Sequence, residues 1–163
     1  MIVLGIDPGT ATTGYGLVYE GESGPELVTY GVILTPAGAP MPDRLVTIYQ
    51  AIKDLIALHR PATGAVEKLY FQKNVSTAMT VGQARGVALL AMAQAGLSVG
   101  EYNPRDVKQA VAGYGAADKK QMQGMVKAVL NLSEAPKPDD AADALAVAIC
   151  HLHSARLKAL TDQ

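Results

Sequence analysis

The sequence predicts an α/β fold in which helices pack on one mixed five-stranded sheet. Twelve of the first 35 residues are Val, Ile or Thr, whereas 19 of the 26 alanines lie at or beyond Ala78. β-branched residues favour strands and alanine favours helices. Strand-like and helix-like segments alternate in the second half, an order typical of sheets covered by helices. At 163 residues, the whole chain, residues 1–163, is expected to form a single domain.

The first part of the chain predicts three strands and one helix. Residues 2–6, 15–19 and 27–34 are short apolar runs bounded by glycine or proline. Their short, glycine-rich connections favour an antiparallel meander. Residues 43–58 then change to a helical period, with an apolar stripe made of Leu45, Ile48, Ile52, Leu55 and Ile56.

The central part predicts two further strands separated by a helix. Thr63–Glu67 is short and apolar and lies between helical segments, so we expect a buried strand in a crossover unit. Residues 75–95 form a long alanine-rich segment that predicts a helix. Ser98–Tyr102 is the fifth predicted strand.

The last part predicts three helices. A proline opens the segment Pro104–Ala112, and the loop at residues 113–115 interrupts it. Asp118 is placed to start the next helix, and Pro138 precedes the last one, at about residues 140–159. In that last helix the apolar stripe of Leu145, Ile149 and Leu152 is expected on the side opposite its first acidic residues.

Composition excludes several classes of protein. Apolar residues make up 49% of the chain and charged residues 18%, which excludes a disordered tail. The longest apolar stretch, residues 87–97, is too short to span a bilayer. The N-terminus lacks the basic lead of a signal peptide, and a single cysteine, Cys150, fits a reducing compartment. These features predict a soluble cytoplasmic protein with no membrane partner.

The charge is distributed unevenly along the chain. The net charge is −1, yet residues 67–137 carry nine basic and five acidic side chains. The segments on either side, residues 1–66 and 138–163, carry an acidic excess. The central segment is therefore the one suited to a phosphate-bearing partner, although a solvated basic surface gives the same pattern.

Four carboxylates stand at positions where chemistry is common. Asp7 and Glu67 each end a predicted strand, and ligands bind at strand ends in open α/β sheets. Asp140 and Asp143 are three residues apart, on one side of the last helix. Taken singly, acids at strand ends can mark the chain's emergence into water, and acids in a first helical turn can serve the helix dipole. Taken together, the four predict a metal site.

The donor set indicates which metal. Oxygen-only ligands favour Mg²⁺ or Mn²⁺ over Zn²⁺. Two such ions, roughly 4 Å apart, are suited to the hydrolysis of a phosphodiester. The three histidines, His59, His151 and His153, are interpreted as structural or surface groups rather than ligands.

Five segments, in this order along the chain, resemble the RuvC family of Holliday-junction resolvases. They cover almost the whole sequence and are Gly-Ile-Asp-Pro-Gly at residues 5–9, Val-Glu at 66–67, Gly-Gln-Ala-Arg-Gly at 82–86, Pro-Arg-Asp-Val-Lys-Gln-Ala-Val at 104–111, and Asp-Ala-Ala-Asp-Ala-Leu-Ala at 140–146. The resemblance implies a ribonuclease H-like fold, a homodimer, and paired Mg²⁺-dependent nicking of four-way DNA junctions in recombination and DNA repair. It also implies the branch-migration proteins RuvA and RuvB as partners.

The resemblance also assigns site residues. The family's acidic tetrad corresponds to Asp7, Glu67, Asp140 and Asp143, and its two lysines to Lys108 and Lys119. These lysines flank the loop at residues 113–115, so the two can approach one face, and one of them can hold a scissile phosphate while a metal site carries out the reaction. The neighbouring Lys120 leaves the division of roles open. Further predicted DNA contacts are Lys73, Arg85, Arg105 and Lys120.

An aromatic pair follows the glutamate. The family carries an aromatic wedge three residues after this position, commonly phenylalanine, and the corresponding residue here is Tyr70. Phe71 is the alternative, since one of the two rings is expected to belong to the core. A ring beside a nucleic-acid site can stack on an unpaired base.

Two other functions compete with a nuclease. An actin-like or sugar-kinase-like phosphotransferase also begins with a strand, an aspartate and a Gly-Thr turn, but needs a second nucleotide-binding half. A non-catalytic junction-binding protein shares the fold, although the intact acidic set argues against it.

Overall fold

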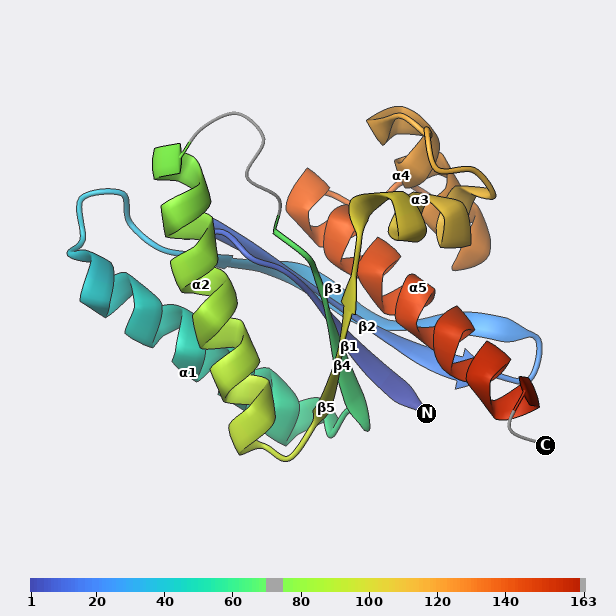
Figure 1. Ribbon diagram of the computed structural model, residues 1–163, viewed down its shortest axis with the longest axis horizontal. Coiled ribbons are helices and arrows are strands. Elements are labelled where there is room, and N and C mark those ends of the chain that lie inside the picture. The colour runs from blue at the N-terminus through green and yellow to red at the C-terminus, as the bar shows by residue number, and fades with distance from the viewer. Residues whose placement is uncertain (70–74, 162–163) are drawn as a thin grey trace.

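The computed structural model describes residues 1–69 and 75–161, which contain one mixed five-stranded sheet (Figure 1). The spatial order is β3-β2-β1-β4-β5. The first three strands form an antiparallel meander, β4 runs parallel to β1, and β5 runs parallel to β4. The strands are β1 (Ile2–Asp7), β2 (Thr12–Gly21), β3 (Gly24–Leu34), β4 (Thr63–Glu67) and β5 (Ser98–Tyr102). This arrangement confirms the predicted mixed sheet.

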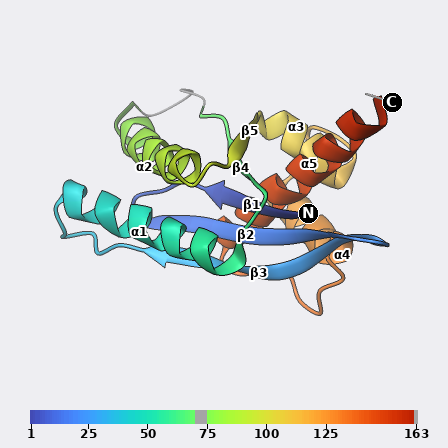
Figure 2. The same cartoon turned by 90° about the horizontal axis from the view of Figure 1, so that it is seen from below.

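The helices lie on both faces of the sheet. α1 and α2 cover one face, while α5 crosses the other and separates the sheet from α3 and α4 (Figures 1 and 2). Their bounds are α1 (Met41–His59), α2 (Val75–Gln94), α3 (Pro104–Ala112), α4 (Lys119–Val129) and α5 (Asp139–Thr161). Within the described ranges, none of these helices is both long enough and apolar enough to cross a membrane.

Alternation along the strands decides which side chains face which helices. In β1, Leu4 and Ile6 belong to the core under α1 and α2, whereas Val3 belongs to the core under α5. Successive strand residues point to opposite faces, so Val3, Gly5 and Asp7 share the α5 face. The same alternation in β4 places Ala65 and Glu67 on that face. Both strand-end acids therefore point toward α5.

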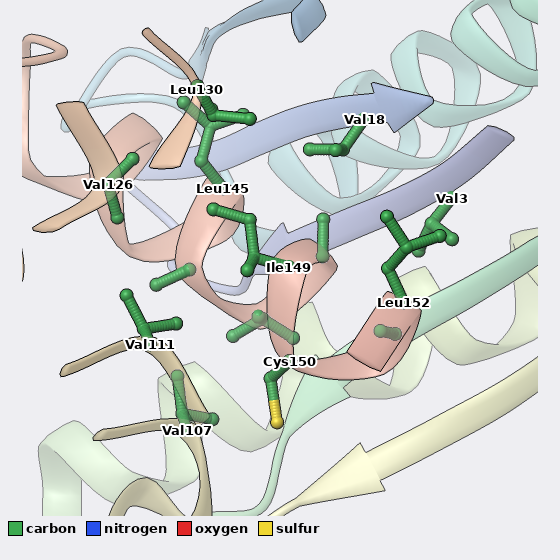
Figure 3. Packing of buried hydrophobic residues seen from close by; sticks show 14 residues of the cluster. Val3, Val18, Val107, Val111, Val126, Leu130, Leu145, Ile149, Cys150 and Leu152 are labelled. Atoms are coloured by element: carbon green, nitrogen blue, oxygen red, sulfur yellow. The ribbon is translucent and has the colours of Figure 1, made fainter. Parts of the chain in front are cut away.

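The last helix differs from the prediction, because it is buried on several sides rather than one. The stripe of Leu145, Ile149 and Leu152 is buried as expected, but Val147 and Cys150 are buried as well. Figure 3 shows the cause: α5 lies between the sheet, which contributes Val3 and Val18, and the outer helices, which contribute Val107, Val111, Val126 and Leu130. The apolar periodicity of one helix does not indicate that other helices, here α3 and α4, also pack on its outer side.

Glycines on β1 and β2 let α5 approach the sheet closely. A Cβ at Gly14 would overlap the carbonyl oxygen of Asp140, and a Cβ at Gly5 would overlap that of Ala144. Any side chain at these positions would push α5 away from the strands. The first turns of α5 are therefore held directly over the end of β1.

The start of α4 is locally encoded. The Asp118 carboxylate accepts the Gln121 backbone N–H at 2.8 Å, and the Gln121 side chain accepts the Asp118 N–H at 2.8 Å. This reciprocal pair is a capping box, and it confirms Asp118 as the helix start. The cap places Lys119 in the first turn, at the end of the helix nearest the start of α5.

Candidate active site

The two strand-end acids lie side by side because their strands are parallel neighbours. Ile6 of β1 is paired with Val66 of β4, so Asp7 and Glu67 follow at the same edge of the sheet. Gly14, the partner of Asp7 across β1 and β2, touches the backbone of Asp140. Sheet pairing and helix packing thus bring the acidic start of α5 to this edge.

The electrostatics show that the acids are close enough to repel one another. The pKa of Asp7 rises from its ordinary 3.8 to about 7, first because of burial and then because of the negative charges of Asp143, Asp140 and Glu67. The pKa of Glu67 is raised by burial and by Asp143, and Lys108 opposes that rise. The pKa of Asp143 is also raised, chiefly by burial, with Lys119 opposing. The four predicted acids therefore form one coupled cluster.

The burial of Asp7, together with this repulsion, predicts that replacing Asp7 stabilises the metal-free protein. The folded pKa of about 7 exceeds the ordinary 3.8, so the folded state binds the proton more tightly than the unfolded chain. Stability is then lost as the pH rises through that window. In EDTA at pH 8, Asp7→Asn should melt several degrees above the wild type, since each kcal/mol is worth about 2–4 °C in a chain of this size.

Thermal melts at several pH values test this expectation. The gain should shrink toward pH 4, where the wild-type carboxyl is protonated in the folded state. Added Mg²⁺ should raise the melting temperature of the wild type more than that of Asp7→Asn. A variant that melts at or below the wild type at pH 8 would contradict the charge cluster.

Both predicted lysines open onto a pocket that two of the four acids also line. This pocket, of about 220 Å³, is lined by Glu67 and Asp143 together with Lys108 of α3 and Lys119 of α4. Its apolar wall consists of Pro104, Val107, Met122, Ala146 and Val147. The structure therefore brings Lys108 and Lys119 to one face, as their placement around the 113–115 loop predicts. The two ammonium groups can bind an anion, and the two carboxylates can bind cations that hold the same anion.

Lys119 has carboxylate partners in two consecutive turns of α5. Its Nζ lies 2.9 Å from Oδ2 of Asp139 and 3.9 Å from Oδ2 of Asp143. Gln123 Nε2 donates to the other oxygen of Asp139 at 2.7 Å. The hydrogen bond from Lys119 lowers the pKa of Asp139 and raises that of the lysine. The sequence holds no local signal for this contact, because Lys119 and Asp139 lie 20 residues apart on different helices.

The donor set fits a hard divalent cation. Four coupled carboxylates supply only oxygen ligands, and their repulsion, expressed in the raised pKa of Asp7, is relieved by a bound positive charge. Within the described ranges, no three acidic, histidine or cysteine side chains lie close enough to hold one ion together. An ion held by three of these side chains would require them to draw closer, whereas Mg²⁺ is commonly held by one or two carboxylates together with waters and phosphate oxygens.

The remaining predicted DNA contacts fall into three groups. Arg105 and Lys120 are exposed near the pocket, on α3 and α4. Arg85 is largely turned inward, where it hydrogen-bonds the Glu67 carbonyl and pairs with Glu101. Tyr70, Phe71 and Lys73 lie outside the described residues. None of these contacts with DNA is tested by the structure, so all of them stay predictions.

Two of the three histidines have structural partners. His151 hydrogen-bonds the Tyr102 hydroxyl at 2.7 Å and the Thr63 hydroxyl at 3.0 Å, which ties α5 to β4 and β5. His153 lies 3.3 Å from the carbonyl oxygen of Ala110 on α3. These contacts confirm the structural interpretation of both side chains.

Comparison with known proteins identifies the family to which the chain belongs. The family model described as crossover junction endodeoxyribonuclease RuvC matches residues 3–151. The chain belongs to the RuvC family. Members of this family are metal-dependent nucleases, and the match favours a nuclease over a phosphotransferase or a non-catalytic binding protein.

Individual relatives match over nearly the whole chain. The crossover junction endodeoxyribonuclease RuvC of Chloroflexus aurantiacus is 59% identical over 155 residues, which cover 95% of this chain and 94% of that protein. Thermus thermophilus RuvC is 38% identical, with a TM-score of 0.90 and 97% of each chain covered. The same protein in complex with Holliday junction substrate gives a TM-score of 0.91, with 97% of this chain and 96% of that one covered. These likenesses confirm the predicted ribonuclease H-like resolvase fold.

Proposed function

We propose that the chain is a structure-selective endonuclease that resolves Holliday junctions by paired symmetric nicks, in homologous recombination and DNA repair. One observation carries the proposal: in a chain of the RuvC family, four carboxylates form a coupled cluster, and two of them, Glu67 and Asp143, line a pocket together with Lys108 and Lys119. The RuvC of Thermus thermophilus, solved with a Holliday junction, supports the same substrate.

The four carboxylates are proposed to hold two Mg²⁺ ions per subunit, with Mn²⁺ able to substitute. Such ions stabilise the attacking and the leaving oxygen of a phosphodiester. The contribution of the chain is to present Asp7, Glu67, Asp140 and Asp143 from two strand ends and one helix start, so that the phosphate enters where their charges converge. α5 fixes this geometry because it is packed tightly onto β1 and β2.

Lys108 and Lys119 are proposed to hold the scissile phosphate. Phosphoryl transfer depends mainly on positioning and on stabilising developing negative charge. Lys119 is paired with Asp139 and Asp143, so its ammonium is directed toward the carboxylates. Lys108 lines the same pocket and acts electrostatically on Glu67.

A direct assay tests the proposed function. The chain is incubated with a synthetic four-way junction or with a linear duplex of the same sequence, in Mg²⁺ or in EDTA. We expect cleavage of the junction alone and only with the metal. Junction binding without metal-dependent cleavage would instead support a non-catalytic binding protein, and detectable ATP binding would support a phosphotransferase.

A homodimer is proposed because a four-way junction presents two equivalent strands, which a two-fold pair of active sites matches. Nicks should fall at symmetry-related positions in opposing strands. Dimers mixed from one wild-type and one Asp7→Asn subunit should nick only one strand, as shown by end-labelling all four strands. Single nicks at random strands, or a monomer that resolves junctions at full rate, would contradict the dimer.

Tyr70 is proposed as a stacking wedge at the crossover. Unpairing a base costs a few kcal/mol, and stacking on a ring recovers about 1–3 kcal/mol of that cost. Tyr70→Ala should slow cleavage of a fully paired junction by about tenfold or more, and Tyr70→Phe should cleave like the wild type because stacking requires only the ring. A junction already unpaired at its crossover should restore much of the rate of Tyr70→Ala. If Tyr70→Ala loses thermal stability and is equally slow on both junctions, the ring belongs to the core and Phe71 becomes the candidate wedge to test.

The remaining proposals concern context. Residues 1–163 are proposed to form one nuclease domain, because both helical layers pack on a single sheet. Action on chromosomal junctions implies a cytoplasmic location in a bacterial cell and cooperation with RuvA and RuvB, which migrate the junction. Exposed Arg105 and Lys120, together with Lys73, are proposed as further phosphate contacts.

A further inference from the structure

The peptide unit that joins Glu67 to Lys68 is held at both ends. On one side the Lys68 N–H donates to the Tyr102 carbonyl oxygen of β5 at 2.7 Å. On the other side the Glu67 carbonyl oxygen accepts from Nε of Arg85 at 3.2 Å. A peptide unit is planar, so fixing both its ends fixes the backbone that carries the Glu67 side chain.

Arg85 reaches this point from the middle of α2, which lies beside β4 and β5 (Figure 2). A second nitrogen of its guanidinium pairs with the Glu101 carboxylate on β5. Its side chain is only 19% exposed, against 44% for Glu101. One side chain therefore ties α2, β4 and β5 together directly at the last residue of β4.

The chemistry of arginine suits this task. The guanidinium is a rigid planar fork that donates to two acceptors at once, here a carbonyl oxygen and a carboxylate. A lysine at this position carries a single nitrogen on a flexible stem and cannot reproduce the fork. A glutamine carries no charge for Glu101.

We propose that Arg85 is a positioning residue that orients Glu67 toward the pocket it shares with Lys108 and Asp143. The proposal rests on the proposed nuclease function, because Glu67 must be one of the metal-holding carboxylates. It is an alternative to the predicted DNA phosphate contact at Arg85, because two of the N–H donors of this arginine are engaged within the protein.

The test compares Arg85→Gln, Arg85→Lys and Glu101→Gln with the wild type. Ala88→Gly, one turn along α2 and fully buried, is the matched control for loss of helix stability. For each protein four quantities are measured: the single-turnover cleavage rate with enzyme and metal saturating, the Mg²⁺ concentration that gives half the maximal thermal stabilisation, the junction Kd with its salt dependence in Ca²⁺, and the melting temperature.

We expect Arg85→Gln to cleave about 10–100-fold more slowly and to need about tenfold more Mg²⁺ for half-maximal stabilisation, as for other groups that orient metal ligands. Arg85→Lys should fall between Arg85→Gln and the wild type, and Glu101→Gln should lose less, because Arg85 still reaches the Glu67 carbonyl. The junction Kd and its salt dependence should stay at wild-type values. Ala88→Gly should lose melting temperature without a change in cleavage rate or Mg²⁺ requirement.

Four outcomes would overturn the proposal. Weaker junction binding with a lower salt slope, at an unchanged saturating rate, would make Arg85 a phosphate contact. Equal slowing of Arg85→Gln and Ala88→Gly, in step with their melting temperatures, would make its role purely structural. A wild-type rate and Mg²⁺ requirement in Arg85→Gln, beside an inactive Glu67→Gln, would remove the positioning role alone. A fully active Glu67→Gln would refute the site assignment of the proposed function and the Arg85 proposal with it.

Discussion

Conversion of any one of the four acids to its amide is expected to lower the single-turnover cleavage rate about a thousandfold or more. Metal binding requires the negative charge, and each variant keeps the shape of the side chain while removing that charge. A loss of about 4 kcal/mol of transition-state stabilisation corresponds to this factor. The variants are Asp7→Asn, Glu67→Gln, Asp140→Asn and Asp143→Asn.

Junction binding by the same variants should remain at least as tight as in the wild type. Affinity for DNA arises mainly from lysine and arginine contacts with phosphates, and each variant removes a negative charge from the phosphate site. Binding and cleavage are measured on one preparation of each protein. If two of the four variants cleave at the wild-type rate, the tetrad assignment is wrong. If binding is lost together with cleavage, the acids support the fold of the DNA surface rather than the reaction.

Lys119→Ala is expected to slow cleavage about a hundredfold, the usual effect of removing one group that stabilises developing negative charge. Its neighbour Lys120 provides a matched control, because it carries the same charge, is also exposed and lies in the same turn of α4. Among the described residues Lys119 makes the ion pairs with Asp139 and Asp143, whereas Lys120 makes none. Lys120→Ala should therefore weaken junction binding slightly and leave the saturating rate unchanged.

Single-turnover rates at saturating enzyme separate the two lysines. Lys108→Ala, which changes the other cation of the pocket, should behave like Lys119→Ala. If Lys120→Ala is the slow variant and Lys119→Ala is not, the roles of the neighbours are exchanged. If a higher enzyme concentration fully restores Lys119→Ala, the lysine contributes only to binding.

Much of the fold could be predicted from local sequence. The bounds of β4, β5 and α3 agree with the sequence-based ranges, because each element begins at or near a proline or glycine. Pro61, followed by Ala62, precedes β4, Gly96 precedes β5, and Pro104 is the first residue of α3. β2 and β3 extend beyond their apolar cores, since pairing with each other continues through residues of low strand propensity up to Gly21 and Gly24. Propensity is local, whereas strand length depends on the partner strand.

The residues of the candidate site could be predicted from the sequence, but the contacts between them could not. Asp7 and Glu67 could be identified because each ends a predicted strand. Asp140 and Asp143 could be identified because a spacing of three residues places both on one side of a helix. The contacts Lys119–Asp139 and Arg85–Glu67 had no local signal. Their partners lie 20 and 18 residues apart in sequence and meet only through the packing of separate elements.

The sequence by itself determined the family, the alternation that turns Asp7 and Glu67 to one face, and the oxygen-only donor set, because these depend on residue type and on spacing within one element. Only the tertiary structure showed how strongly the four acids repel one another. It also showed which of the two adjacent lysines pairs with carboxylates of α5, and that Arg85 hydrogen-bonds the backbone of Glu67. Those properties depend on distances between elements, which are set by glycine contacts under α5 and by the packing of helices on both faces of the sheet. Burial, finally, is a property of the whole packed chain, and burial is the first cause of the raised pKa of Asp7.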